Sequence, residues 1–135
     1  MDRYILFLTL AVFTIVAISS CTCLSDMKPG PPDKVVKIRT KNLHGKNPSI
    51  EPPWEHLEYG TDQQIIWEID NPELNFTVMF KKNETPFDKH EFNKNANKSG
   101  RAEHDPGEKE KFYKYSIKVD GFDLIDPGII IWRRN

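Results

Sequence analysis

The chain has 135 residues, of which 38% are hydrophobic and 29% are charged, so it has room for one globular domain of ordinary size and not for two. Its 19 basic and 20 acidic residues give a formal net charge of -1, which excludes the broad positive footprint of a nucleic-acid-binding protein. Both cysteines, Cys21 and Cys23, lie near the N-terminus, so the body of the chain contains neither a disulfide nor a thiolate metal site.

The N-terminal segment predicts an export signal. Residues 4–18 are uninterrupted apolar or weakly polar, and the run has the length of a signal-peptide core. A helix that spans a bilayer needs about 20 apolar residues, so an uncleaved anchor is the weaker interpretation. We therefore expect residues 1–20 to form a signal helix ahead of the folded domain. A cleaved signal of a soluble exported protein and an uncleaved anchor are the alternatives.

The end of this segment, residues 18–21 (Ile-Ser-Ser-Cys), resembles the lipobox of bacterial lipoproteins. The resemblance implies that Cys21 is acylated with a fatty acid such as palmitate, becomes the mature N-terminus and anchors the chain in a membrane. Thr22 follows in place of an aspartate, which by the same resemblance implies an outer-membrane lipoprotein that faces the periplasm. Prolines and charges then dominate, so residues 21–34 are expected to form a flexible tether.

Residues 35–135 are expected to form one β-domain. Apolar and basic side chains alternate over residues 35–40, the period of a strand with one buried face. A loop rich in Pro, Gly and Asn follows over residues 41–53. Residues 54–59 then predict a short strand or a turn of helix.

Two core strands are predicted in the middle of the domain. Residues 64–69 (QIIWEI) are β-branched and aromatic, and residues 75–81 alternate with phenylalanine and valine on one face. Residues 82–110 are too polar for a core element. They predict a long loop, with a helical turn over residues 88–94.

Two further strands close the domain. Residues 111–119 alternate between tyrosine or aliphatic and polar side chains, whereas residues 128–132 are uniformly apolar and predict a strand covered on both faces. Several short strands separated by turns, with no helical period, predict an all-β sandwich or barrel. We expect six side chains in its core: Trp67, Phe76, Val78, Phe80, Tyr115 and Ile117.

The order of these features resembles the cupredoxin family. A Gly-Thr-Asp turn at residues 60–62 leads into the strand of Trp67, a strand through Phe76 and Phe80 follows, and a strand with Tyr-Lys-Tyr at residues 113–115 comes near the end. The resemblance covers roughly residues 34–135. It implies a cupredoxin-like Greek-key β-sandwich, for which other sandwiches such as the immunoglobulin-like class are the alternative.

The resemblance does not extend to the copper ligands. A blue-copper site takes two imidazoles, one thiolate and usually a weak axial thioether. By the resemblance, the first histidine position falls near Phe76 and the cysteine position near Ile117. The remaining ligands would fall within residues 118–127, which contain neither His nor Met. We therefore expect no blue-copper site and no other cofactor.

Histidines supply the alternative metal site. All four lie in segments that we expect to be loops, and none is paired at a spacing that preforms a metal site: His44, His56, His90 and His104. His90 and His104 are each followed by an acidic residue and are the pair that would hold a metal ion if their loops converge. No known catalytic motif occurs, so we do not expect an enzyme.

Three aromatic residues are candidates for a platform that binds a sugar or a peptide: Trp54, Tyr59 and Trp132. Burial in the core is the alternative for each. Trp54 is the one expected at the surface, because it follows two prolines and precedes charged residues.

The sequence is compatible with two functions. The first is a non-catalytic cell-envelope lipoprotein whose loops bind a protein or glycan partner. The second is a periplasmic metal-handling protein that uses loop histidines and carboxylates.

Overall fold

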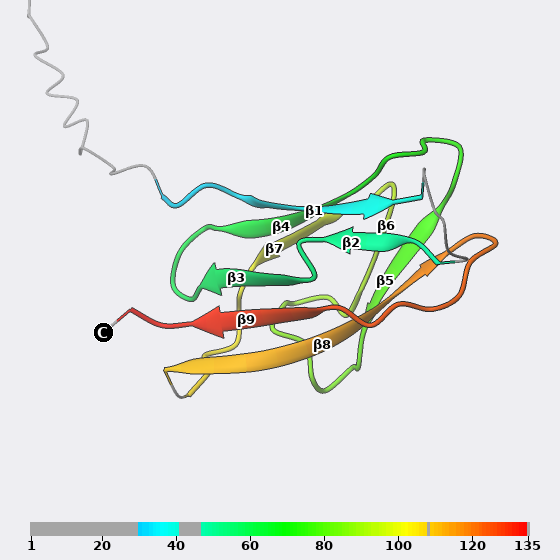
Figure 1. Cartoon of the computed structure of the whole chain (residues 1–135). Coiled ribbons are helices and arrows are strands. Elements are labelled where there is room, and N and C mark those ends of the chain that lie inside the picture. Colours follow the sequence, from blue (N-terminus) through cyan, green and yellow to red (C-terminus); the bar gives the residue numbers. More distant parts are fainter. Residues whose placement is uncertain (1–29, 41–46, 108, 135) are drawn as a thin grey trace, which may run out of the picture.

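The computed structural model describes residues 30–40, 47–107 and 109–134 as an all-β fold (Figure 1). Nine strands and no helix occur among these residues, which confirms the all-β prediction. The expected signal helix (residues 1–20), the acylation site Cys21 and most of the expected tether lie outside the described residues.

One sheet has four strands in the order β2-β1-β4-β7. Its strands are β1 (Lys34–Arg39), β2 (Ser49–Glu51), β4 (Gln64–Ile69) and β7 (Lys98–Arg101). β1 runs parallel to β4, while β2 and β7 are antiparallel to their neighbours. The apolar side chains that alternate along β1 and β4 therefore point to one face of this sheet.

The second sheet has five strands in the order β3-β9-β8-β5-β6. Its strands are β3 (Trp54–Glu58), β5 (Phe76–Phe80), β6 (Glu91–Asn93), β8 (Glu110–Val119) and β9 (Gly128–Trp132). β3 and β9 are parallel and the other pairs are antiparallel. β9 lies between β3 and β8, which agrees with its uniformly apolar sequence.

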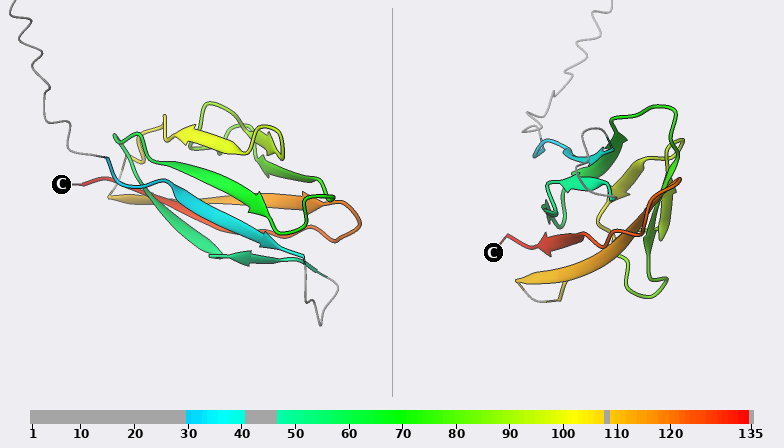
Figure 2. Two further views of the ribbon diagram at one scale, coloured as in Figure 1. Left: turned by 90° about the horizontal axis from the view of Figure 1, so that it is seen from above. Right: turned by 45° about the vertical axis from the view of Figure 1, so that its right-hand side comes forward.

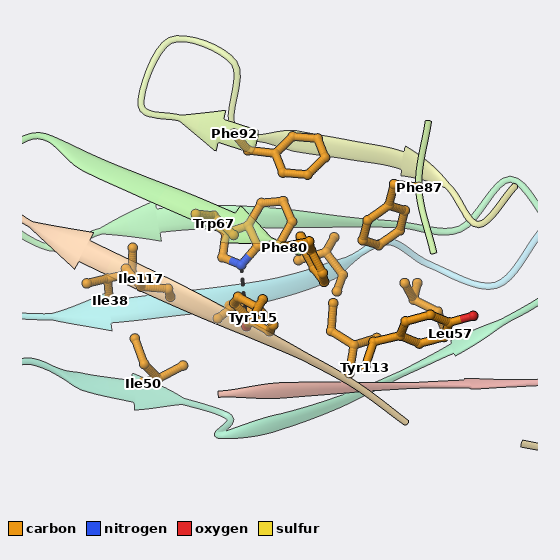
Figure 3. Close-up of a cluster of buried hydrophobic side chains, with 14 of the residues drawn as sticks. Ile38, Ile50, Leu57, Trp67, Phe80, Phe87, Phe92, Tyr113, Tyr115 and Ile117 are labelled. Carbon is orange, nitrogen blue, oxygen red and sulfur yellow. Dashed lines mark hydrogen bonds between the residues drawn. The ribbon is translucent and has the colours of Figure 1, made fainter. Parts of the chain in front are cut away.

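The core lies between the two sheets, in a sandwich-like arrangement (Figures 2 and 3). All six side chains that were expected there are buried, none with more than 4% of its surface exposed. Trp67 stacks on Phe92 at 5.0 Å between ring centroids, and its Nε1 donates a hydrogen bond of 3.4 Å to the hydroxyl oxygen of Tyr115. Burial raises the pKa of Tyr115 to about 12, because the charged phenolate would be poorly solvated there.

The segment expected to be one long loop contains two strands. β6 pairs with β5, and β7 pairs with β4, so the predicted loop over residues 82–110 and its helical turn over residues 88–94 are wrong. Each of these strands buries one side chain, Phe92 in β6 and Ser99 in β7. A single buried position gives no alternation, and for this reason the sequence pattern does not reveal either strand. The expected loop over residues 41–53 likewise contains β2 near its end.

The two ends of the described domain lie close together (Figures 1 and 2). Gln63 joins them: its Nε2 donates a hydrogen bond of 2.7 Å to the carbonyl of Pro32, and its Oε1 accepts one of 3.1 Å from the backbone N–H of Glu58. The Glu58 carboxylate pairs with Arg134 at 3.1 Å. The segment that precedes β1 and the segment that follows β9 are thereby fixed at one end of the domain.

Candidate functional site

The outer face of the five-stranded sheet gathers exposed aromatic and basic side chains. In the strand register, Trp54 of β3 lies opposite Gly128 of β9, and Gly128 lies opposite Lys114 of β8. Phe112 of β8 lies two residues before Lys114 and shares its face, because side chains alternate along a strand. Since Tyr113 and Tyr115 point into the core, this face is the one turned away from it.

Trp54 lies over Gly128. A Cβ atom added to Gly128 would come within 2.6 Å of three carbons of the six-membered ring of Trp54, so only glycine leaves room for the indole. The side chain of Trp54 nevertheless remains 43% exposed. The ring is held against the sheet on one side and is accessible from solvent on the other.

Phe112 stands beside Trp54 and is also exposed, at 59%. The ring centroids are 6.2 Å apart and the ring planes meet at 81°, an edge-to-face contact. The two rings therefore form an open corner on the surface, which we call the aromatic corner (Trp54 and Phe112). An apolar group of a ligand has two ring surfaces to contact there.

A hollow of 390 Å³ opens beside Phe112, and we call it the lysine hollow. Its lining residues come from the turn that follows β5 and from the first half of β8: Lys81, Asn83, Glu84, Lys111, Phe112, Tyr113 and Lys114. The single carboxylate, Glu84, pairs with Lys81 at 3.4 Å. Lys111 places its ammonium 5.1 Å from the centre of the Tyr113 ring. Phe112 thus belongs to both the aromatic corner and the lysine hollow.

A second hollow of 470 Å³ adjoins the first and shares Asn83, Lys111 and Tyr113 with it. Its other lining residues are Lys82, Thr85, His104 and Asp105. Asp105 forms an ion pair of 3.2 Å with Arg133 and accepts a hydrogen bond from the backbone N–H of Gly107. Because Asp105 is already paired with Arg133, the side chains of Lys82 and Lys111 extend the basic surface of the lysine hollow toward His104.

The structure separates the three aromatic residues considered for a platform. Trp54 is exposed, as expected, whereas Tyr59 and Trp132 are half-buried. Trp132 lies opposite Glu58 at the other end of β3, four residues along the strand from the position of Trp54, which corresponds to about 13 Å. The guanidinium of Arg134 lies 6.0 Å from the centre of the Trp132 ring. Trp54 therefore has Phe112 as its aromatic neighbour.

Phe112 is the site residue that the sequence interpretation missed. A usable signal was present, because Phe112 has the same parity as Lys114, Ser116 and Lys118, the positions assigned to the outer face of this strand. A large aromatic residue on a polar face is a reason to look for a binding surface.

His56 lies on β3, so the expectation that it lies in a loop is wrong, and His44 lies outside the described residues. His90 and His104, the pair considered for metal binding, do not line the same hollow. His104 lines the second hollow, whereas His90 lines neither. The backbone carbonyl of His90 accepts a hydrogen bond from Phe80, at the point where the chain enters β6. In the described part of the chain, no group of three or more His, Cys, Asp and Glu side chains is arranged to hold a metal ion.

Comparison with known proteins adds no relative: the chain matches no family model, no curated protein and no solved structure. Within residues 30–40, 47–107 and 109–134, no helix is long and apolar enough to cross a membrane.

Proposed function

We propose that this protein is a non-catalytic binding module of a bacterial cell-envelope lipoprotein. In this proposal Cys21 carries the lipid anchor, the domain faces the periplasm from the outer membrane, and the aromatic corner binds a protein or glycan partner. The resemblance of residues 18–21 to a lipobox supports the anchor. The aromatic corner supports the binding role.

The aromatic corner is the observation that carries the proposal. Large exposed rings are unfavourable in water, and two of them side by side on a strand face are typical of a contact surface. Gly128 and the edge-to-face contact hold Trp54 in one position before any ligand arrives. A surface ordered in advance loses less conformational entropy on binding than flexible side chains do.

The proposal includes a cupredoxin-like sandwich without a blue-copper site. Two mixed sheets around one core, with Trp67 on β4 and Tyr113 and Tyr115 on β8, support this fold assignment. Phe76 and Ile117, which stand at the first histidine and the cysteine positions by the cupredoxin resemblance, are buried apolar side chains. Apolar packing in place of metal ligands agrees with a binding module that needs no cofactor.

The anchor is tested by growing bacteria that express the full chain with an alkyne-labelled fatty acid. We expect the label on the wild type and on Cys23→Ala, and its loss on Cys21→Ala. Equal labelling of the wild type and Cys21→Ala would refute acylation at this cysteine.

The binding face is tested in the same cells with a photoreactive benzoylphenylalanine at position 56. His56 is exposed and lies in the same row of the sheet as Phe112, because both are opposite Ile130. Position 37, on the exposed side of β1 in the other sheet, is the matched control. We expect crosslinks from position 56, reduced by Trp54→Ala, and few from position 37. Equal crosslinking from both positions, or no effect of Trp54→Ala, would refute binding at the aromatic corner.

A further inference from the structure

We propose that the ligand of the aromatic corner is an acidic glycan, a polymer of sugars that carry carboxylate groups. This inference rests on the proposed binding function and specifies its ligand. One face of a sugar ring stacks on the aromatic corner, and the carboxylates of the same polymer pair with lysines of the adjoining lysine hollow.

The charge of the surface favours an anionic ligand. The carboxylates that line the two hollows, Glu84 and Asp105, are already paired with Lys81 and Arg133. Three further lysines of this surface have no carboxylate partner among the described residues: Lys82, Lys111 and Lys114. A ligand that supplies carboxylates at regular intervals satisfies these ammonium groups, and the attraction also speeds its approach.

The shape of the surface favours a sugar. The C–H groups on one face of a pyranose ring form an apolar surface, which suits the electron-rich face of the Trp54 indole. Phe112 stands at 81° to that indole, so it forms a wall against the edge of a ring lying on Trp54. On its other side Phe112 borders a hollow of 390 Å³, which is large enough for a further sugar with its carboxylate.

The position of the surface argues against other anionic partners. The first half of β8, residues 110–114, pairs with β9 alone, so an acidic peptide could add as a strand only on the side of β8 that faces away from β9 and β3, where it would not cover Trp54. The net charge of -1 argues against a nucleic acid. A flat membrane surface would make no use of the hollow beside Phe112. Repeated sugar rings with carboxylates use the rings, the hollow and the lysines together.

The test compares two forms of one polymer. The full chain in a non-ionic detergent is titrated calorimetrically with polygalacturonate and with its fully methyl-esterified form, which has the same sugars without the charges. We expect the acidic form to bind at least about tenfold more tightly, and this preference to shrink as salt is raised, because salt screens exposed charges.

The variants separate the rings from the charges. Trp54→Ala and Phe112→Ala are expected to weaken the binding of the acidic polymer by about tenfold or more, as for central residues of a contact surface, whereas Trp54→Phe retains most of it. The double variant Lys111→Gln/Lys114→Gln is expected to remove the preference for the acidic form. The matched controls, Leu124→Ala for an exposed apolar side chain and Lys37→Gln for an exposed lysine, should bind like the wild type.

Each alternative result is decisive. Equal binding of the acidic and esterified polymers would overturn the acidic specificity. Binding to phosphatidylglycerol vesicles or single-stranded DNA, with the acidic polymer inactive, would overturn the glycan inference. If neither polymer binds, the glycan inference fails, and crosslinking from position 56 decides whether the proposed function stands. Thermal unfolding of each variant shows that it is folded, and Phe112→Ala, which removes a largely exposed ring, keeps the test valid if Trp54→Ala unfolds.

Discussion

Gly128→Ala is expected to displace Trp54 from the aromatic corner. The new methyl group would occupy the space of the indole, so either the ring or the strand must move. Backbone strain is not involved, because Gly128 is not one of the glycines with positive φ. β9 is held on both sides by β3 and β8, whereas the ring is free on its outer side, so we expect the ring to move.

The expected loss of stability follows from the contacts of Trp54. The indole is 43% exposed, so over half of its surface is covered, and uncovering about 100 Å² costs about 2.5 kcal/mol. Loss of the edge-to-face contact with Phe112 adds about 1 kcal/mol. Alanine in place of glycine within a strand returns about 0.5 to 1 kcal/mol. The net loss in the free energy of unfolding is therefore about 2.5 to 3 kcal/mol.

Urea unfolding of four proteins measures this effect: the wild type, Gly128→Ala, Trp54→Ala and the double variant. In the Trp54→Ala background no ring remains to be displaced, so Gly128→Ala should be neutral or stabilising by about 0.5 to 1 kcal/mol. The tryptophan emission of Gly128→Ala should also shift to longer wavelength as Trp54 enters water. The reasoning is refuted if Gly128→Ala costs the same with and without Trp54.

Three further predictions concern the core. Burial raises the pKa of Tyr115 to about 12 from an ordinary value of 10.0, so the unfolded chain loses this proton at lower pH than the folded chain does. The contribution of Tyr115 to the free energy of unfolding is therefore constant below pH 10 and falls by up to about 3 kcal/mol as the pH approaches 12. Tyr115→Phe should remove that slope in urea unfolding across this range, and an unchanged slope would assign it to other groups. Phe92→Ala should cost about 3 to 5 kcal/mol in urea unfolding if β6 belongs to the core, and a loss below about 1 kcal/mol would contradict this. Ser99→Ala should cost about 1 to 3 kcal/mol, because the buried backbone N–H of Ile65 loses its 2.9 Å acceptor, and fast hydrogen exchange of that amide should accompany the loss; wild-type protection would argue against it.

The sequence predicts the central strands well because each carries several buried side chains at every second position. Val78 and Phe80 in β5, and Tyr115 and Ile117 in β8, are inside as expected. β6 and β7 differ, since Phe92 and Ser99 are their only buried side chains. Such strands are defined by neighbours far along the chain and not by their own pattern.

The candidate site could be predicted only in part for a related reason. The two prolines before Trp54 indicate its exposure, and the alternation in β8 indicates that of Phe112. That the two rings meet depends on a third strand, because Gly128 of β9 lies between Trp54 and Lys114 in the register. Local patterns do not specify which strands become neighbours, so the aromatic corner becomes visible only in the folded domain.

β8 serves the core and the proposed binding surface at once. Its inner positions, including Tyr113 and Tyr115, hold the two sheets together, and its outer positions present Phe112 and Lys114. Residues 110–114 of β8 are paired with β9, and a side chain on a paired strand has less freedom than one on a loop. The position of Phe112 relative to Trp54 is therefore set by the register. The sequence alone predicts binding through the loops, as is common for β-sandwiches. The exposed rings favour the sheet face instead, because there the same hydrogen bonds that stabilise the fold also fix the geometry of the aromatic corner.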